Sequence, residues 1–328
     1  MKDLIKTLLS SPRLSEKTQI GNIWNYFPKF ASVQGKDVLL GDDAAAIEND
    51  GQYLLLAAEG VYQPLLKSDP YLAGRTSVLT NVNDIYSMGG RPVALLDVLF
   101  SSGVDELDQV LSGIYDNASR YCVPVVGGHL NSESNESALA VFILGKANKL
   151  LSSFNAKAGD DLILVTSNNG NFNDDYNFWD SSSELSKNRI IKELEILPQI
   201  AEEGLADAAK DISMAGVIGS LLMLLECSEK GAEINIDNFS TPPGVTLSDW
   251  LLTFPSYGFV LSIRPENTVN VQKKFSNLGL LCEKIGKVNA DQKIYVANDK
   301  GKKELFWDLK LRSFIGMNKS DSKKVING

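Results

Sequence analysis

Several carboxylates of this sequence stand directly after predicted strands. Asp42 and Asp43 follow an apolar strand over 37–40, and Glu59 follows a second strand over 52–58. Taken alone, an aspartate after a strand is most often a turn residue. The alternative is that these side chains meet at one place and act together as oxygen ligands.

Two further acids fit the second interpretation. Asp84 lies one turn after Asn81 in an apolar helix predicted over 71–89, so both side chains share a face. A lone charge at such a position is costly when it is buried. Asp211 precedes another apolar helix and could merely cap it. Together the acids suggest a site for Mg²⁺, a hard ion that is usually held by a few carboxylates and by substrate phosphates.

The only histidine of the chain, His129, follows an apolar run and the pair Gly127 and Gly128. Imidazole is a poor ligand for Mg²⁺, so His129 is not expected to hold that ion alone. A glycine pair at a strand end exposes backbone N–H groups to ligands. The two open hypotheses are a histidine that lines a ligand site and a surface histidine.

Composition and charge narrow the class of protein. The 328 residues correspond to about two domains of ordinary size. A net charge of −9 argues against nucleic acid as a partner. No apolar segment is long enough for a membrane helix, and three scattered cysteines do not form a disulfide framework, so we expect a cytoplasmic protein. Neither a P-loop nor a GxGxxG motif is present.

Strand and helix patterns alternate along the chain, which predicts α/β and α+β layers. The sequence from 195 to 211 is predicted to be helical. Residues 167–188 are rich in Asn, Asp and Ser and form the least regular segment. Irregular segments of this length are usually lids or binding loops, or else mobile.

Four motifs carry a resemblance to a known superfamily. GDDAAAI (41–47), NVNDIYSMGGRPVALLDVL (81–99), VVGGH (125–129) and DISMAG (211–216) occur in that order. They resemble the aminoimidazole ribonucleotide (AIR) synthase superfamily, also called PurM-like, which includes thiamine-phosphate kinase and selenophosphate synthetase. The resemblance covers roughly 37–286, and the chain as a whole looks most similar to an uncharacterised AIR-synthase-related branch.

The resemblance implies a two-domain fold and an ATP site. Residues 1–150 would form an α/β domain whose strands pair with those of a second subunit in a homodimer, and 151–328 an α+β domain. ATP, Mg²⁺ and a small-molecule substrate would bind to them. The residues implied as metal ligands are Asp42, Asp43, Asp84 and Asp211, of which Asp211 is also the catalytic candidate. The residues implied beside the nucleotide are Glu59, Asn81, Gly127, Gly128 and His129.

Departures from the named enzymes are informative. At three matching motif positions thiamine-phosphate kinase carries an aspartate, whereas this chain carries Glu59, His129 and Met214. GGH is similar to selenophosphate synthetase, but that enzyme needs a reactive cysteine or selenocysteine before the GDDAA motif, and this chain has no cysteine before Cys122. Neither enzyme is therefore expected.

The leading hypothesis is an enzyme that phosphorylates or phosphate-activates a small molecule with ATP and Mg²⁺. The alternative is a nucleotide-binding sensor or scaffold without turnover, since a lost acid can leave binding intact. An inert globular domain is a third hypothesis, which an acid inside the 71–89 helix disfavours. Arg75, Arg91 and Lys210 are candidates for holding an anionic substrate, although each type more often serves at the surface or in ion pairs.

Overall fold

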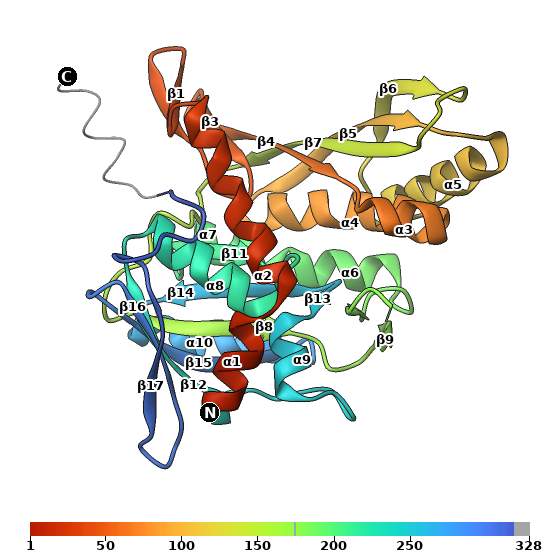
Figure 1. Cartoon of the computed structure of the whole chain (residues 1–328). Helices are drawn as coiled ribbons and strands as arrows, with labels where there is room; N and C mark the ends of the chain where they lie inside the picture. Colours follow the sequence, from red (N-terminus) through yellow and green to blue (C-terminus); the bar gives the residue numbers. More distant parts are fainter. Residues whose placement is uncertain (174, 318–328) are drawn as a thin grey trace. The chain divides into compact units, whose positions relative to one another are not determined.

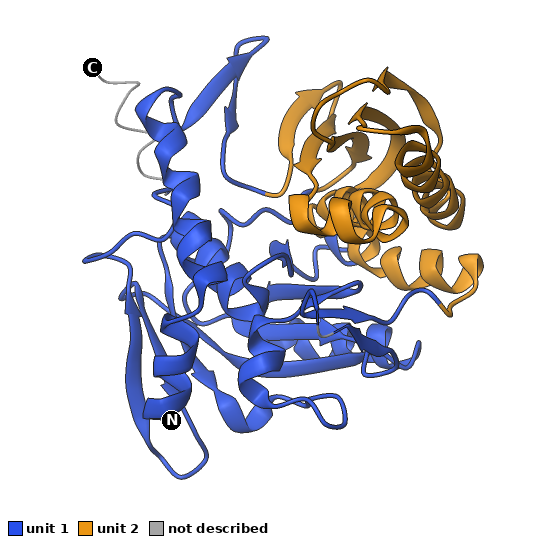
Figure 2. Ribbon diagram, turned by 45° about the vertical axis from the view of Figure 1, so that its right-hand side comes forward, with its two compact units in different colours: residues 1–42, 150–183, 200–328 blue, residues 43–149, 184–199 orange. Residues whose placement is uncertain are grey.

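The computed structural model describes residues 1–173 and 175–317 (Figure 1). Contacts group the chain into two compact units, each built from more than one stretch of sequence (Figure 2). Unit 1 consists of Met1–Asp42, Leu150–Ser183 and the chain from Ile200 onward, and unit 2 of Asp43–Lys149 and Glu184–Gln199. The expected domain boundary at 150 lies at one unit boundary, whereas residues 1–42 and 184–199 each join the other half of the sequence.

Unit 2 is built on a five-stranded sheet in the order β3-β4-β7-β5-β6. The strands are β3 (Ala45–Asn49), β4 (Gln52–Gly60), β5 (Arg91–Phe100), β6 (Val125–Asn131) and β7 (Ala138–Ala147). Its helices are α3 (Gln63–Ser68), α4 (Pro70–Ser87), α5 (Val104–Tyr121) and α6 (Lys187–Leu194). Neighbouring strands are antiparallel except for β5 and β6, which are parallel and joined through α5.

The two faces of this sheet differ in exposure. Side chains alternate between the faces along a strand, and on β5 Leu95 and Leu99 are buried while Leu96 is 46% exposed. Helix α4 covers the buried face, where Ile85 packs so closely on β7 that a Cβ at Gly145 would lie 2.5 Å from the isoleucine Cγ2. The opposite face presents apolar side chains to solvent.

Helix α4 is the best-defined helix of unit 2. Its N-cap Asp69 accepts a hydrogen bond from the Leu72 N–H at 2.9 Å, and Pro70 occupies the first turn. Gly89, at φ +75°, ends the helix in the left-handed conformation that glycine favours. The predicted helix over 71–89 is thereby confirmed.

Unit 1 is built on a seven-stranded sheet in the order β11-β14-β8-β15-β12-β16-β17. Its strands are β8 (Asp161–Thr166), β11 (Ala208–Asp211), β12 (Gly231–Asn235), β14 (Gly258–Ile263), β15 (Leu281–Asn289), β16 (Lys293–Ala297) and β17 (Lys303–Asp308). Helix α8 (Gly216–Cys227) is buried at every residue and lies in the main core of this unit. Helix α10 (Pro265–Ser276) packs against β8 and β15. Each unit thus joins a sheet to helices, which confirms the predicted α/β and α+β architecture.

The remaining elements of unit 1 are short. Among them are α1 (Lys2–Leu9), α2 (Pro12–Lys17), η1 (Thr18–Asn25), β1 (Phe30–Val33), β2 (Lys36–Leu39), η2 (Ile236–Asn238) and α9 (Leu247–Leu252). Leu8 and Leu14 of the first two helices join the core around α8, so the N-terminal segment packs with the C-terminal half of the sequence.

Two predictions about secondary structure are wrong in part. The sequence 195–211 is not one helix: α7 (Ile196–Glu202) is followed by the edge strand β11, which pairs with β14. The segment 167–188 is not irregular throughout, because it contains β9 (Asn171–Asn173) and β10 (Phe178–Asp180). These form a small sheet with β13 (Phe254–Pro255).

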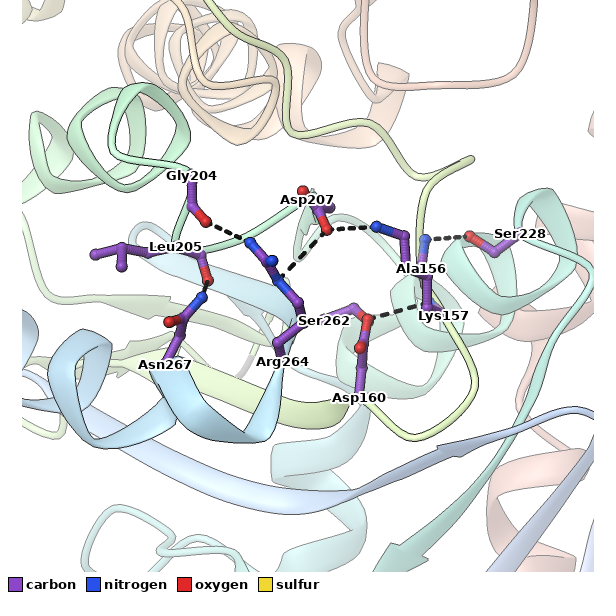
Figure 3. A network of polar contacts seen from close by, with 10 residues as sticks. All are labelled: Ala156, Lys157, Asp160, Gly204, Leu205, Asp207, Ser228, Ser262, Arg264 and Asn267. Carbon is purple, nitrogen blue, oxygen red and sulfur yellow. Dashed lines mark hydrogen bonds and ion pairs between the residues drawn. The ribbon is translucent and has the colours of Figure 1, made fainter.

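A network of polar contacts holds the turn before β11 (Figure 3). The Asp207 carboxylate accepts a hydrogen bond from Lys157 Nζ at 2.8 Å and lies 3.9 Å from Arg264 Nε. Arg264 also donates to the Gly204 carbonyl at 2.6 Å. These contacts fix the start of the strand that ends at Asp211.

Candidate functional site

Helix α4 carries three polar side chains on one buried face. Asn81, Asp84 and Ser87 follow one another at intervals of three residues, and none is more than 5% exposed. Residues at this spacing lie above one another on a helix. We call these three residues the α4 polar face. Burial of polar groups destabilises a fold unless they find partners, so this face needs partners beyond the helix.

Asp43 lies against the α4 polar face. One of its carboxylate oxygens is within 4.8 Å of a carboxylate oxygen of Asp84. The Ser87 hydroxyl donates to Asp43 Oδ2 at 2.6 Å and holds it there. Two carboxylates at this separation repel each other, and a divalent cation would remove the repulsion.

Asn81 adds an oxygen that the rest of the described chain does not use. Its Nδ2 donates to the Ser77 carbonyl at 2.8 Å. Its Oδ1 is buried and has no hydrogen-bond partner among the described residues. Such an oxygen destabilises the fold as it stands, whereas amide and carboxylate oxygens are suitable ligands for Mg²⁺ or Ca²⁺. The donor set therefore fits a hard cation.

Asp42 has different partners from those of its neighbour Asp43. Within unit 1 its carboxylate accepts hydrogen bonds from the Ser152 hydroxyl at 2.7 Å and from the Ser153 N–H at 3.1 Å. Unit 2 begins at Asp43. The two consecutive aspartates thus have partners in different units. Asp42 is bound by residues of the stretch Leu150–Ser183 in unit 1, and Asp43 is bound by Ser87 of helix α4 in unit 2.

Asp211 ends β11 in unit 1 and is 3% exposed. It does not cap the helix that follows, because the N-cap of α8 is Ala215 and no side chain caps that helix. The Ser220 hydroxyl donates to the Asp211 carbonyl at 2.7 Å, which ties the second turn of α8 to the end of β11. The capping alternative for this acid is therefore excluded.

Glu59 and Gly128 lie in one row across the sheet of unit 2. The row runs from Glu59 through Val141 and Asp97 to Gly128. Three strand spacings separate its ends, or roughly 14 Å. The structure therefore does not bring Glu59 next to the glycine pair.

His129 lies on the other face of the sheet. It pairs with Val98 on β5, and Val98 alternates with the buried positions that face α4. The imidazole ring is 5.9 Å from the Phe100 ring, in a tilted arrangement, and is exposed. His129 and the α4 polar face are thus on opposite sides of this sheet, while Gly127 and Gly128 precede the histidine on the edge strand β6.

The sequence reasoning missed two polar residues near these candidates. Ser87 lies three residues after Asp84, and this helical spacing was a usable signal. Asp97 interrupts the apolar strand β5 between the buried residues Leu95 and Leu99. Burial raises the pKa of the Asp97 carboxyl above its ordinary value. A charged residue at a core-facing position of a strand was the signal in this case.

The basic residues considered for an anionic substrate have structural contacts. Arg91 donates to Glu195 at 2.8 Å, and Arg75 donates to Asn117 at 3.2 Å. Lys210 is only 2% exposed within β11. These contacts agree with the common role of such residues in ion pairs and packing.

The sequence matches two family descriptions over most of its length. Residues 41–147 match "AIR synthase related protein, N-terminal domain", and residues 157–298 match "AIR synthase related protein, C-terminal domain". The chain belongs to the AIR synthase-related family. The resemblance drawn from the four motifs is confirmed.

Two relatives align over most of the chain, and both are named as uncharacterized proteins. One, from Synechocystis sp., is 43% identical over 86% of this chain and 88% of its own length. The other, from Methanocaldococcus jannaschii, is 37% identical over 71% of this chain and 73% of its own length.

Solved structures share the fold at low identity. PurL of T. maritima complexed with ATP has a TM-score of 0.73 at 18% identity, over 92% of this chain. This chain spans 49% of the PurL chain. AaThiL complexed with AMPPCP and TMP has a TM-score of 0.61 at 18% identity, over 82% of this chain and 92% of its own. These likenesses confirm the PurM-like fold.

Among the described residues, no helix is both long and apolar enough to cross a membrane.

Proposed function

We propose that this protein binds ATP with Mg²⁺ and transfers or activates phosphate on a small molecule. The observation that carries the proposal is the α4 polar face, where Asp84 and the unpartnered Asn81 oxygen lie beside Asp43. Family membership supports it, because PurL and AaThiL, which share this fold, were solved with ATP and with AMPPCP.

The roles that we propose for the individual residues are those expected from the sequence, except where stated. Asp43 and Asp84, with the Asn81 oxygen, would hold one cation on α4. Asp42 and Asp211 are proposed as further metal ligands, with Asp211 as the catalytic residue. Glu59, Gly127 and Gly128 are proposed as contacts of the nucleotide. His129 is not proposed as one, because it lies on the face of the sheet opposite to the α4 polar face.

Bound Mg²⁺ would neutralise charge on the transferred phosphate. The protein's own contribution is to keep the oxygens in place before the nucleotide arrives. Helix α4 is anchored at both ends, and Ser87 fixes the Asp43 carboxylate, so little rearrangement is needed on binding.

Calorimetry with a non-hydrolysable ATP analogue tests the proposal. We expect binding in the presence of Mg²⁺ and its loss when EDTA is added. In Asp84→Asn the affinity should fall by about 100-fold, because the amide removes a charged metal ligand. Equal affinity with and without Mg²⁺, or an unchanged Kd in a folded Asp84→Asn variant, would refute the metal role.

A sensor or scaffold without turnover is the second candidate. The loss of acids at His129 and Met214 relative to thiamine-phosphate kinase favours it. Incubation of pure protein with ATP and a metabolite collection separates the two candidates. ADP release that depends on a metabolite excludes the sensor, whereas nucleotide binding without any turnover excludes the enzyme.

We also propose that two copies associate through the solvent-exposed face of the unit 2 sheet. Leu56, Leu96 and Phe142 form an apolar surface there and are between 37% and 50% exposed. Contiguous apolar surface of this kind usually marks an interface. Light scattering should give the mass of a dimer for the wild type and of a monomer for Leu96→Lys.

A further inference from the structure

We infer that Met317 is a positioning residue for Asp42, and that it acts by restricting the glycine that precedes this acid, Gly41. The inference rests on the metal role proposed above for Asp42. Gly41, Asp42 and Met317 all belong to unit 1, although Met317 lies far along the chain from the other two.

Gly41 is the residue on which the chain turns towards Asp42. Its φ of +106° lies in a region that glycine adopts readily and other residues rarely adopt. Glycine also has more conformational freedom to lose on ordering than any other residue. A turn on glycine therefore needs its surroundings to hold it in one conformation.

Met317 packs directly on this glycine. A Cβ built at Gly41 would lie 2.8 Å from Met317 Cγ and 3.3 Å from Met317 Cβ. The three heavy atoms nearest to that Cβ position all belong to Met317. The methionine side chain thus fills the space beside Gly41 and limits the rotation of its backbone.

Met317 is itself held in place. It is fully buried in the main core of unit 1, together with Phe314 and Ile315 of the same segment. The carbonyl of Ile315 also accepts a hydrogen bond from Trp24 Nε1 at 2.7 Å. Because three apolar side chains share the burial, the position of this segment does not depend on a single contact.

Two further groups of contacts surround the turn. Cys227 Sγ, at the end of α8, lies 3.7 Å from the Gly41 carbonyl oxygen. Ser152 and Ser153 bind the carboxylate of Asp42. The two serines orient the acid itself, whereas Met317 restricts the backbone from which it extends.

The consequence is a carboxylate that is already in place when the metal arrives. Fixing the backbone of one residue opposes binding through lost entropy, and in this fold the cost is met during folding. In Met317→Ala the freedom of Gly41 returns and the cost moves to the binding step. The affinity for a non-hydrolysable ATP analogue with Mg²⁺ should fall by about tenfold, or about 1.4 kcal/mol.

Calorimetry on the full chain, below the melting temperature of each variant, measures this loss. Met223→Ala is the matched control, because Met223 of α8 is buried in the same core and is not among the atoms nearest to Gly41. Both alanine variants leave a cavity and should melt at a lower temperature. Met223→Ala should nevertheless bind the analogue as the wild type does, and so should Met317→Leu, which conserves volume.

A double-mutant cycle tests whether Met317 acts through Asp42. Asp42→Asn should weaken binding with Mg²⁺, and the addition of Met317→Ala should weaken it no further, because the positioned group is already lost. Losses that add in full would show that Met317 affects binding by another route and would overturn the inference.

The outcomes separate this inference from the proposed function. Wild-type affinity in folded Met317→Ala overturns the role of Met317 and leaves the metal role of Asp42 standing. An equal loss in Met223→Ala also overturns it, because the effect would then be general to the core. Wild-type affinity in folded Asp42→Asn overturns the metal role of Asp42 and the inference with it.

Discussion

Helix α4 of unit 2 and helix α8 of unit 1 both have many buried residues, and each carries one acidic residue. The groups that surround these two carboxylates differ in kind. Glu226 of α8 accepts hydrogen bonds from the backbone N–H groups of Phe314, Ile315 and Gly316, at 2.7, 2.7 and 3.2 Å. Asp84 of α4 instead lies beside a second carboxylate, Asp43.

The difference lies in what completes each site. The chain itself supplies every donor around Glu226, and these donors partly oppose the effect of burial, which raises the pKa of that carboxyl. Around Asp84 the chain supplies further acceptors, including an Asn81 oxygen that no described residue uses. A buried acid whose oxygens accept backbone N–H groups serves the fold, whereas two neighbouring carboxylates beside an amide oxygen that has no hydrogen-bond partner are suited to a cation.

The largest expected effect is on stability, at Glu226. Glu226→Ala would leave three backbone N–H groups near Phe314 without an acceptor, and the free energy of unfolding should fall by about 3 kcal/mol. Urea denaturation measures this loss. Nucleotide affinity, measured below the melting temperature, should stay at the wild-type value, and a parallel loss of binding would contradict the division between the two helices.

Asn81→Ala should show the reverse pattern. The substitution removes a hydrogen bond to Ser77 but also an unpartnered oxygen, so the unfolding free energy should change by less than about 1 kcal/mol. The Mg²⁺ affinity should fall by about tenfold. A variant that is strongly destabilised but binds Mg²⁺ normally would show that Asn81 is a structural residue like Glu226.

The smallest effect concerns Asp97. Because burial raises its pKa in the folded state, the charged form is disfavoured there, and the wild type should lose stability as the pH rises from the ordinary carboxyl pKa through the raised one. Asp97→Asn should lack this loss, with a difference below about 1 kcal/mol for a half-buried group. Thermal melts of both proteins between pH 3 and 7, roughly the range of carboxyl titration, measure it; parallel curves would contradict the assignment.

Much of the α4 site is predictable from sequence. The apolar residues of the segment and the glycine at its end predict the helix, and the spacing of Asn81 and Asp84 places both on one face. The burial of Asp84 follows from its apolar neighbours. What these patterns do not contain is the partner of Ser87, because the contact joins residues 44 positions apart and serine has no preference that would reveal it.

The failures have a different physical cause. AAKD (208–211) is rich in alanine, the best helix former, yet it forms an edge strand because β14 offers a hydrogen-bonding partner. Likewise the polar segment around β10 becomes ordered by pairing with Phe254 and Pro255, far along the chain. In both cases a non-local partner overrides local preference.

The most direct test of the central claim is a crystal grown with Mn²⁺, which can replace Mg²⁺, and a non-hydrolysable ATP analogue. We expect an anomalous scattering peak within bonding distance of Asp43, Asp84 and the Asn81 oxygen. A nucleotide-bound crystal with no peak at these three side chains would contradict it.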